Sequence, residues 1–225
     1  MHRTLRSFLG GLIVLLVLFW GMVWLAEARP HSAAAVALNQ VTTRLFGPDA
    51  AARLGGGALP AGVEIGGPFH LTDDHGRPVS DSNYRGRWLL VDFGYTTCPD
   101  VCPTELQTIA GALDKLGPQA GKIVPLFITV DPARDTAAVL ADYVKLFDPR
   151  LIGLTGTQEQ IAAVARAYRV YYAKVQPKGT TTYLMDHSAF IYLMDPEGRF
   201  SALFNPSSTA DELAAAIREH LSEKS

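Results

Sequence analysis

The longest apolar segment of the chain lies close to its N-terminus. Phe8 to Ala26 is an uncharged run of 19 residues that follows Arg3 and Arg6. At about 1.5 Å per helical residue, this run nearly matches a hydrocarbon core about 30 Å thick. We expect it to be a membrane-spanning helix, with the basic tip on the cytoplasmic side and the rest of the chain across the membrane.

A cleaved signal peptide is the alternative for this segment. The tripeptide Ala26-Glu27-Ala28 resembles a cleavage site, but the apolar core of a signal peptide is shorter, about 7 to 15 residues. We therefore favour an anchor over residues 1–28 and an Ala- and Gly-rich spacer over 29–61. A mitochondrial presequence is not evident, because the apolar run starts almost at the first residue. We expect a bacterial inner-membrane protein whose soluble domain faces the periplasm.

Residues 62–225 alternate short apolar runs with amphipathic stretches, which predicts one domain. Apolar runs typical of strands buried on both faces cover residues 88–93, 123–130 and 151–154. Helical periodicity covers residues 103–116, 136–147, 157–168 and 209–221. Strands that alternate with helices predict an α/β fold, with parallel strand pairs and helices on the faces of the sheet.

Two turn signals add antiparallel hairpins to this pattern. Asp-Asp-His-Gly separates residues 69–72 from 78–79, and Asp-Pro-Glu-Gly separates 190–194 from 200–204. A short strand over 171–175 precedes a polar loop that runs to residue 183. The order of strand, cysteine loop, helix, strand and terminal hairpin with helix is that of a thioredoxin-like fold.

The chemistry of the chain is concentrated at its two cysteines, Cys98 and Cys102. They follow a predicted buried strand and open a predicted helix, where ligands meet α/β sheets and where helix amides stabilise a thiolate. Two thiolates at this spacing form a disulfide or hold one soft metal ion. A purely structural disulfide is disfavoured, because so small a loop contributes only about 2 kcal/mol.

A third metal ligand would come from the six histidines of the chain. His187 stands out because it follows the polar loop and directly precedes a predicted strand, whereas His75 lies in a turn and His220 ends a helix. The residues alone leave this choice open. The net charge of −2 and the absence of a basic stripe give no case for nucleic acid binding.

A resemblance to a known family narrows these alternatives. The segment from Gly94 to Leu106, GYTTCPDVCPTEL, resembles the signature of the SCO/SenC copper proteins. Three further segments match in order: ITVDPARDT over 128–136, DHS over 186–188 and DPEG over 195–198. The similarity covers roughly residues 66–221. One departure is Thr97, which stands where many relatives have a histidine.

The resemblance implies that Cys98, Cys102 and His187 are ligands of copper, as Cu(I), Cu(II) or both. It also implies a membrane-anchored, thioredoxin-like assembly factor that passes copper to the dinuclear centre of cytochrome c oxidase subunit II. Other periplasmic copper chaperones and thiol reductases are further expected partners. Three carboxylates are expected to shape the site or the partner surface, or to orient the histidine: Asp131, Asp135 and Asp186.

Two classes of function remain at this stage. A copper metallochaperone needs no covalent chemistry on a substrate and is therefore not an enzyme in the strict sense. A thiol-disulfide oxidoreductase, which would reduce the cysteines of the oxidase copper site or of other envelope proteins, would use Cys98 and Cys102 as a redox disulfide. The spacing disfavours it, because such enzymes typically carry Cys-x-x-Cys, and it gives His187 no role.

Overall fold

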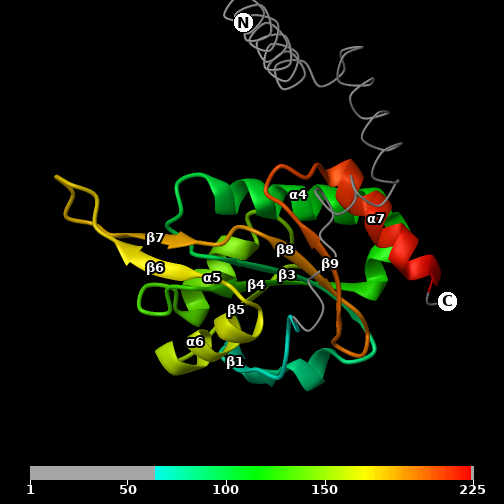
Figure 1. The fold of residues 1–225 in the computed structure, drawn as a ribbon, viewed down its shortest axis with the longest axis horizontal. Helices are drawn as coiled ribbons and strands as arrows, with labels where there is room; N and C mark the ends of the chain where they lie inside the picture. The colour runs from blue at the N-terminus through cyan, green and yellow to red at the C-terminus, as the bar shows by residue number, and fades with distance from the viewer. Residues whose placement is uncertain (1–63, 224–225) are drawn as a thin grey trace, which may run out of the picture. The chain divides into compact units, whose positions relative to one another are not determined.

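A seven-stranded mixed β-sheet forms the centre of the fold (Figure 1). The computed structural model describes residues 64–223. The predicted anchor over 1–28 and spacer over 29–61 therefore lie outside the described residues. Within the part that is described, no helix is both long and apolar enough to cross a bilayer.

The strands of this sheet are β1 (His70–Asp73), β2 (Pro78–Ser80), β3 (Trp88–Gly94), β4 (Ile123–Thr129), β5 (Ile152–Thr155), β8 (Ile191–Met194) and β9 (Phe200–Phe204). Their order is β2-β1-β5-β4-β3-β8-β9. The central strands β3, β4 and β5 are parallel, and both hairpins are antiparallel, as predicted. The mixed α/β class is thus confirmed, and β3 lies inside the sheet between β4 and β8.

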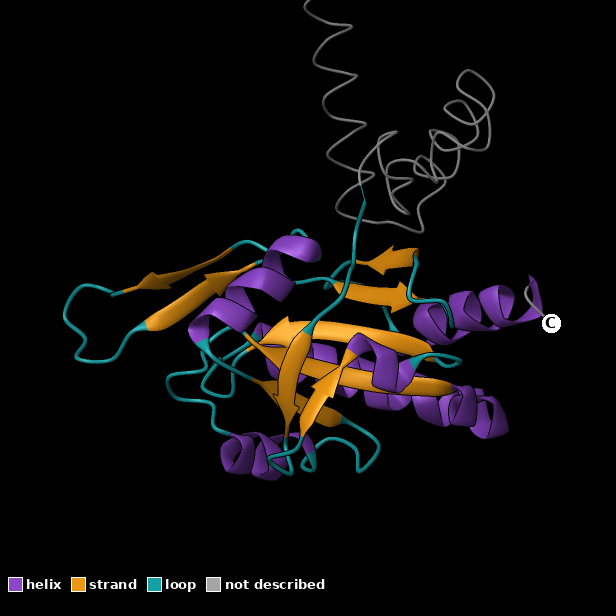
Figure 2. Cartoon of the chain, turned by 90° about the horizontal axis from the view of Figure 1, so that it is seen from below, coloured by secondary structure: helices purple, strands orange, loops and turns teal. Residues whose placement is uncertain are grey.

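The helices cover both faces of the sheet (Figure 2). They are α4 (Val101–Leu116), α5 (Ala137–Val144), α6 (Gln158–Ala167) and α7 (Ala210–Glu223), with two 3₁₀ turns, η1 (Asp81–Tyr84) and η2 (Gly117–Lys122). On one face, α4 and α7 lie side by side and share an apolar cluster with α5. On the other face, Ile161 and Val164 of α6 pack into a second cluster with β3 and β4.

Local signals in the sequence account for several helix ends. Thr157 and Gln160 form a capping box at the start of α6, and Thr209 accepts from the Glu212 amide at the start of α7. The helix predicted over 136–147 is shorter in the structure, where α5 ends at Val144. Pro149 disfavours helical backbone at Asp148, so the helix could not continue past Phe147.

A separate two-stranded ribbon projects beyond the sheet (Figure 1) and consists of β6 (Tyr172–Val175) and β7 (Leu184–His187). Strand β6 was predicted, but β7 was not, because residues 184–187 were left unassigned between the polar loop that ends at residue 183 and the strand predicted from residue 190. In the ribbon, Tyr172 stands opposite His187. The histidine is therefore the last residue of a paired strand.

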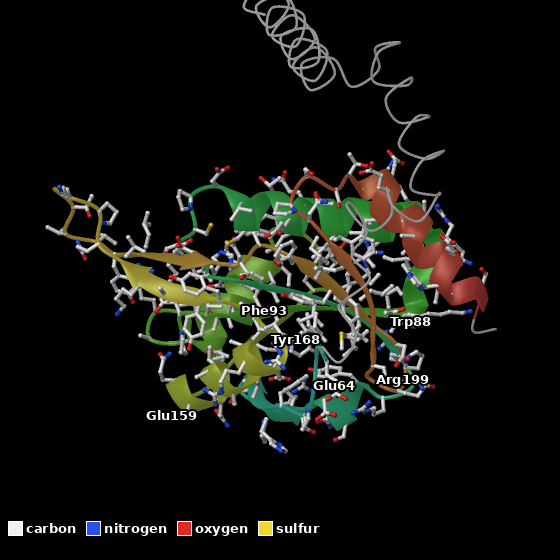
Figure 3. The ribbon with its side chains drawn as sticks, in the orientation of Figure 1. Glu64, Trp88, Phe93, Glu159, Tyr168 and Arg199 are labelled. Atoms are coloured by element: carbon white, nitrogen blue, oxygen red, sulfur yellow. The ribbon has the colours of Figure 1, made fainter. Side chains whose placement is uncertain are left out.

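Aromatic side chains fill the face of β3 that is opposite α4. Phe93 packs against Tyr168, which follows α6, with ring centroids 5.3 Å apart (Figure 3). Tyr192 of β8 meets both rings edge-on. On the face toward α4 the strand ends in Gly94, and a Cβ there would lie 2.7 Å from the ring of Phe127 and 2.8 Å from the sulfur of Cys102.

Gly94 therefore lets the helix and its cysteine approach the strand. We expect Gly94→Ala to lower the free energy of unfolding by about 1–3 kcal/mol, because the added methyl group overpacks a filled space. Urea denaturation of the full chain measures this change. Gly121→Ala is the matched control, since a Cβ at Gly121 meets nothing within 4 Å. Equal stability of the two variants would contradict the close approach described here.

Candidate metal centre

The two cysteines lie where β3 passes into α4. Cys102 is fully buried in the first turn of α4, and Cys98 is half-buried in the loop before it. The helix begins at Val101, two residues earlier than predicted, so the helix start includes Cys102. The amides of Asp100 and Cys102 consequently point at the sulfur of Cys98 and favour its thiolate. No disulfide joins the two cysteines.

His187 reaches these sulfurs from the end of β7. Its Nε2 lies 3.4 Å from the Sγ of Cys102, and the ligand atoms of Cys98, Cys102 and His187 all lie within 4.8 Å of one another. The other ring nitrogen, Nδ1, is 3.0 Å from the carbonyl oxygen of Ser188. Since a carbonyl only accepts, Nδ1 carries the proton, and the neutral ring has its lone pair on Nε2, toward the sulfurs.

An aromatic residue and an open groove lie beside the triad formed by Cys98, Cys102 and His187. The ring of Tyr95 meets the imidazole of His187 edge-on, with centroids 5.9 Å apart. A groove of about 380 Å³ opens beside the triad. It is lined by the cysteine loop and the ribbon: Tyr95, Cys98, Pro99, Asp100, Val101, Val175, Leu184, Met185, Asp186 and His187. The triad is thus accessible from outside on the side of Cys98 and His187.

Asp135 holds the cysteine loop in place without touching the triad. Its buried carboxylate accepts hydrogen bonds from the amide of Thr96 at 3.0 Å and from the Thr96 hydroxyl at 2.6 Å. It also accepts from the hydroxyl of Thr129 at 2.6 Å. The carboxylate therefore fixes the loop before Cys98 to the end of β4.

Asp131 acts on the histidine side, through the ribbon. It pairs with Arg134 and accepts a hydrogen bond from the Tyr183 hydroxyl at 3.0 Å. The guanidinium of Arg134 lies over the Tyr183 ring at 3.8 Å and donates to the Tyr183 carbonyl at 3.0 Å. Lys174 covers the same ring at 3.8 Å. These contacts tie the ribbon that carries His187 to the loop after β4.

Asp186 differs from the other two predicted carboxylates. It is exposed on β7 and lines the groove, and it is the Ser188 carbonyl that orients the imidazole. Two residues without a predicted role, Arg134 and Tyr183, connect the ribbon to the domain. The Asp-x-x-Arg spacing was a usable signal for the ion pair, but nothing in the sequence marked the carbonyl of Ser188.

The charges of the two sulfurs differ. The hydrogen bond from the thiol of Cys102, helped by His187 and the helix amides and opposed by burial, lowers the pKa of Cys98 to about 3. The same hydrogen bond, together with burial, raises the pKa of Cys102 far above its usual value. Burial lowers the pKa of His187, but hydrogen bonding to Cys98 and Ser188 outweighs it, and the net shift is upward. The metal-free site thus pairs a thiolate at Cys98 with a thiol at Cys102.

Two buried carboxyls near the triad were missed altogether. Asp92 on β3 and Glu105 on α4 are 0% and 1% exposed, and none of their four carboxyl oxygens has a hydrogen-bond partner. Burial raises the pKa of Asp92 well above its ordinary value and that of Glu105 to about 7. Asp92 lies in the run 88–93 that was predicted to be buried on both faces, so its burial could have been inferred, whereas that of Glu105 depends on the packing of α4 against the sheet.

Solved structures of similar proteins contain copper. ScoI of Arabidopsis thaliana with copper bound is 45% identical, with a TM-score of 0.67 over 71% of this chain and 99% of that chain. ScoI of Bradyrhizobium japonicum with copper bound is 49% identical, with a TM-score of 0.64 over 69% of this chain and 98% of that chain. The fold of residues 64–223 is therefore similar to that of copper-binding Sco proteins.

Curated relatives are similar over the same part of the chain. Protein sco1 of Schizosaccharomyces pombe is 44% identical over 68% of this chain and 60% of its own length. The mitochondrial SCO1 homolog of Homo sapiens is 44% identical over 70% of this chain and 53% of its own length. The chain thus matches only about half to three-fifths of the length of these relatives.

The relatives overturn the expected location. A bacterial inner-membrane protein with a periplasmic domain was expected, but the curated relatives of human, Arabidopsis thaliana and Saccharomyces cerevisiae are named as mitochondrial proteins. An apolar run after basic residues indicates only that a segment can enter a bilayer. It does not distinguish one membrane from another, and for this reason the expectation was wrong.

A match to a family model agrees with the geometry and with these relatives. The model described as SCO1/SenC matches residues 58–222, which include the cysteine loop, the ribbon and all of the sheet. The resemblance seen in the sequence is therefore confirmed over most of the chain. The chain belongs to the SCO1/SenC family.

Proposed function

We propose that this protein is a copper carrier that binds one copper ion through Cys98, Cys102 and His187. The observation that carries the proposal is the convergence of two sulfurs and an imidazole nitrogen within 4.8 Å beside an open groove. Copper in the related ScoI structures of Arabidopsis thaliana and Bradyrhizobium japonicum supports the identity of the ion.

The donor set suits copper in particular. Thiolates select soft ions such as Cu(I), and imidazole suits copper in both oxidation states. Cys98 already provides a thiolate, and the Nε2 lone pair of His187 is directed toward the sulfurs by the Ser188 carbonyl. Cys102, a thiol in the metal-free site, must lose its proton to bind the ion. The metal ion is cargo, so binding and release must both be possible, and three protein ligands leave room for a ligand from a partner.

We further propose that the recipient is the dinuclear copper centre of cytochrome c oxidase subunit II. The groove gives a recipient access to Cys98 and His187, whereas Cys102 stays buried. Copper would leave by stepwise exchange of these ligands for those of the partner. We also infer that the domain is thioredoxin-like, since the cysteine loop joins a central strand to the helix that covers it.

A thiol-disulfide oxidoreductase is the second candidate. The two free cysteines are adjacent, and the low pKa of Cys98 gives the attacking thiolate that disulfide exchange requires. Such a protein would reduce cysteines of the oxidase copper site or of another partner. It would not require an imidazole nitrogen aimed at the sulfurs, which is the reason that we favour the copper carrier.

Substitution of His187 separates the two functions. We expect His187→Ala to weaken Cu(I) binding at least 10-fold, because one of three ligands is lost, while the dithiol still forms and opens its disulfide. Anaerobic titration of the reduced full chain against a Cu(I) chelator measures the affinity, and thiol counting follows the disulfide. His70→Ala is the matched control, since His70 is exposed on β1. Unchanged affinity in His187→Ala would remove this residue from the site.

The ionisation of Cys98 gives a pH-dependent prediction for the metal-free protein. With a pKa of about 3, Cys98 is a thiolate throughout the range from about pH 5 to 8. We therefore expect its alkylation rate to change less than about 2-fold over this range, whereas an ordinary thiol with a pKa near 8.5 gains about 10-fold per pH unit. Peptide mapping after iodoacetamide pulses gives the rate. A rate that rises steeply up to pH 8 would contradict the thiolate.

A further inference from the structure

No backbone ladder joins the ribbon that carries His187 to the seven-stranded sheet. Within residues 64–223, β6 and β7 pair only with each other (Figure 1). The position of the imidazole therefore depends on side-chain contacts between the ribbon and the body of the domain. Along β7 these contacts are made by His187 at the sulfurs, by Met185 in the apolar cluster and by Tyr183 at the loop after β4.

The contacts of Tyr183 form a closed group with Asp131 and Arg134, which we call the latch. The Tyr183 hydroxyl donates to one carboxylate oxygen of Asp131 at 3.0 Å, and Nε of Arg134 donates to the other. Nη1 of Arg134 donates to the Tyr183 carbonyl at 3.0 Å and closes the group. Asp131 is only 3% exposed, and hydrogen bonds to a charged group that is shielded from water are stronger than those between neutral groups.

The aromatic ring of Tyr183 adds a second kind of contact. The guanidinium of Arg134 and the ammonium of Lys174 each lie over the ring at 3.8 Å from its centroid. Because Lys174 belongs to β6, these contacts involve both strands of the ribbon. Arg134 also lies 5.7 Å from the ring centroid of Tyr95, and Tyr95 meets the imidazole of His187 edge-on. Arg134 thus acts on the imidazole along β7 and through Tyr95.

Tyr183 and His187 lie at the two ends of β7. Four residues of strand separate them by about 13 Å, at about 3.4 Å per residue. Strand β7 is paired with β6 along its whole length, so a displacement of Tyr183 is carried to His187. Near the histidine, the ribbon has a further polar contact between the Gln158 amide and the Tyr172 hydroxyl at 3.2 Å, but it is exposed to solvent. The latch is therefore the better shielded of the two polar contacts.

We propose that Tyr183, held by Asp131 and Arg134, is a positioning residue for the copper ligand His187. The latch raises the fraction of molecules in which Nε2 already lies beside the sulfurs, and the apparent affinity for copper rises with that fraction. Its effect on copper passes through the imidazole and disappears when the imidazole is removed. This inference rests on the proposed copper site.

A double-mutant cycle tests this dependence on the imidazole. Tyr183→Phe removes one hydroxyl and keeps the ring, and it should weaken Cu(I) binding about 3- to 10-fold in anaerobic chelator titrations of the reduced full chain. In a His187→Ala background the same substitution should change the affinity less than about 2-fold. Tyr171→Phe is the matched control, since this tyrosine directly precedes β6 and is 60% exposed. Its affinity should equal that of the wild type.

A spectroscopic signature of the nitrogen ligand gives a second measurement. In the Cu(II)-loaded protein, the nitrogen hyperfine coupling seen by electron paramagnetic resonance should diminish in Tyr183→Phe and stay unchanged in Tyr171→Phe. Arg134→Lys provides the same two tests through other atoms. It keeps the positive charge but loses the planar fork that joins Asp131 to the Tyr183 carbonyl.

The outcomes separate the latch from the copper site. Equal weakening by Tyr183→Phe with and without the imidazole would show that the tyrosine does not act through His187, and would overturn the proposal. Unchanged affinity and hyperfine coupling in both Tyr183→Phe and Arg134→Lys would also overturn it, while a weakened His187→Ala variant would leave the copper site intact. Unchanged affinity in His187→Ala itself would instead overturn the proposed ligand set.

Discussion

The buried carboxylate of Asp135 is the constraint on which the geometry of the site depends. It joins the amide and hydroxyl of Thr96 to the hydroxyl of Thr129, so the loop before the cysteines cannot move away from the end of β4. Because the fold already holds this loop in place, a bound ion would have less conformational entropy to remove from it. The position of Cys98 relative to the sheet is therefore set by the fold.

The two sides of the triad have opposite electrostatic surroundings. Toward the groove are the helix amides and the imidazole, which favour negative charge on Cys98. On the other side, the hydrogen bond to Cys98, burial and the charge of Asp92 disfavour negative charge on Cys102. The pKa of one sulfur is consequently lowered and that of the other is raised. The metal-free site thus carries one thiolate and not two.

Much of this could be read from the sequence because it is local. Buried strands, the two hairpins and the cysteine loop all have short-range signals, and they were placed within a few residues. Strand β7 had no such signal, since Leu184 to His187 acquire their strand structure only by pairing with β6. The roles of Arg134 and Tyr183 depend on the same pairing. Burial of Glu105 likewise follows from packing between elements and not from any pattern along the chain.

His187 is 85 residues from Cys102 along the chain, and this separation has a consequence for biosynthesis. A growing polypeptide presents both sulfurs long before it contains the imidazole, and the contact between them closes a long loop that forms slowly. A nascent or truncated chain therefore offers an exposed dithiol without its nitrogen ligand.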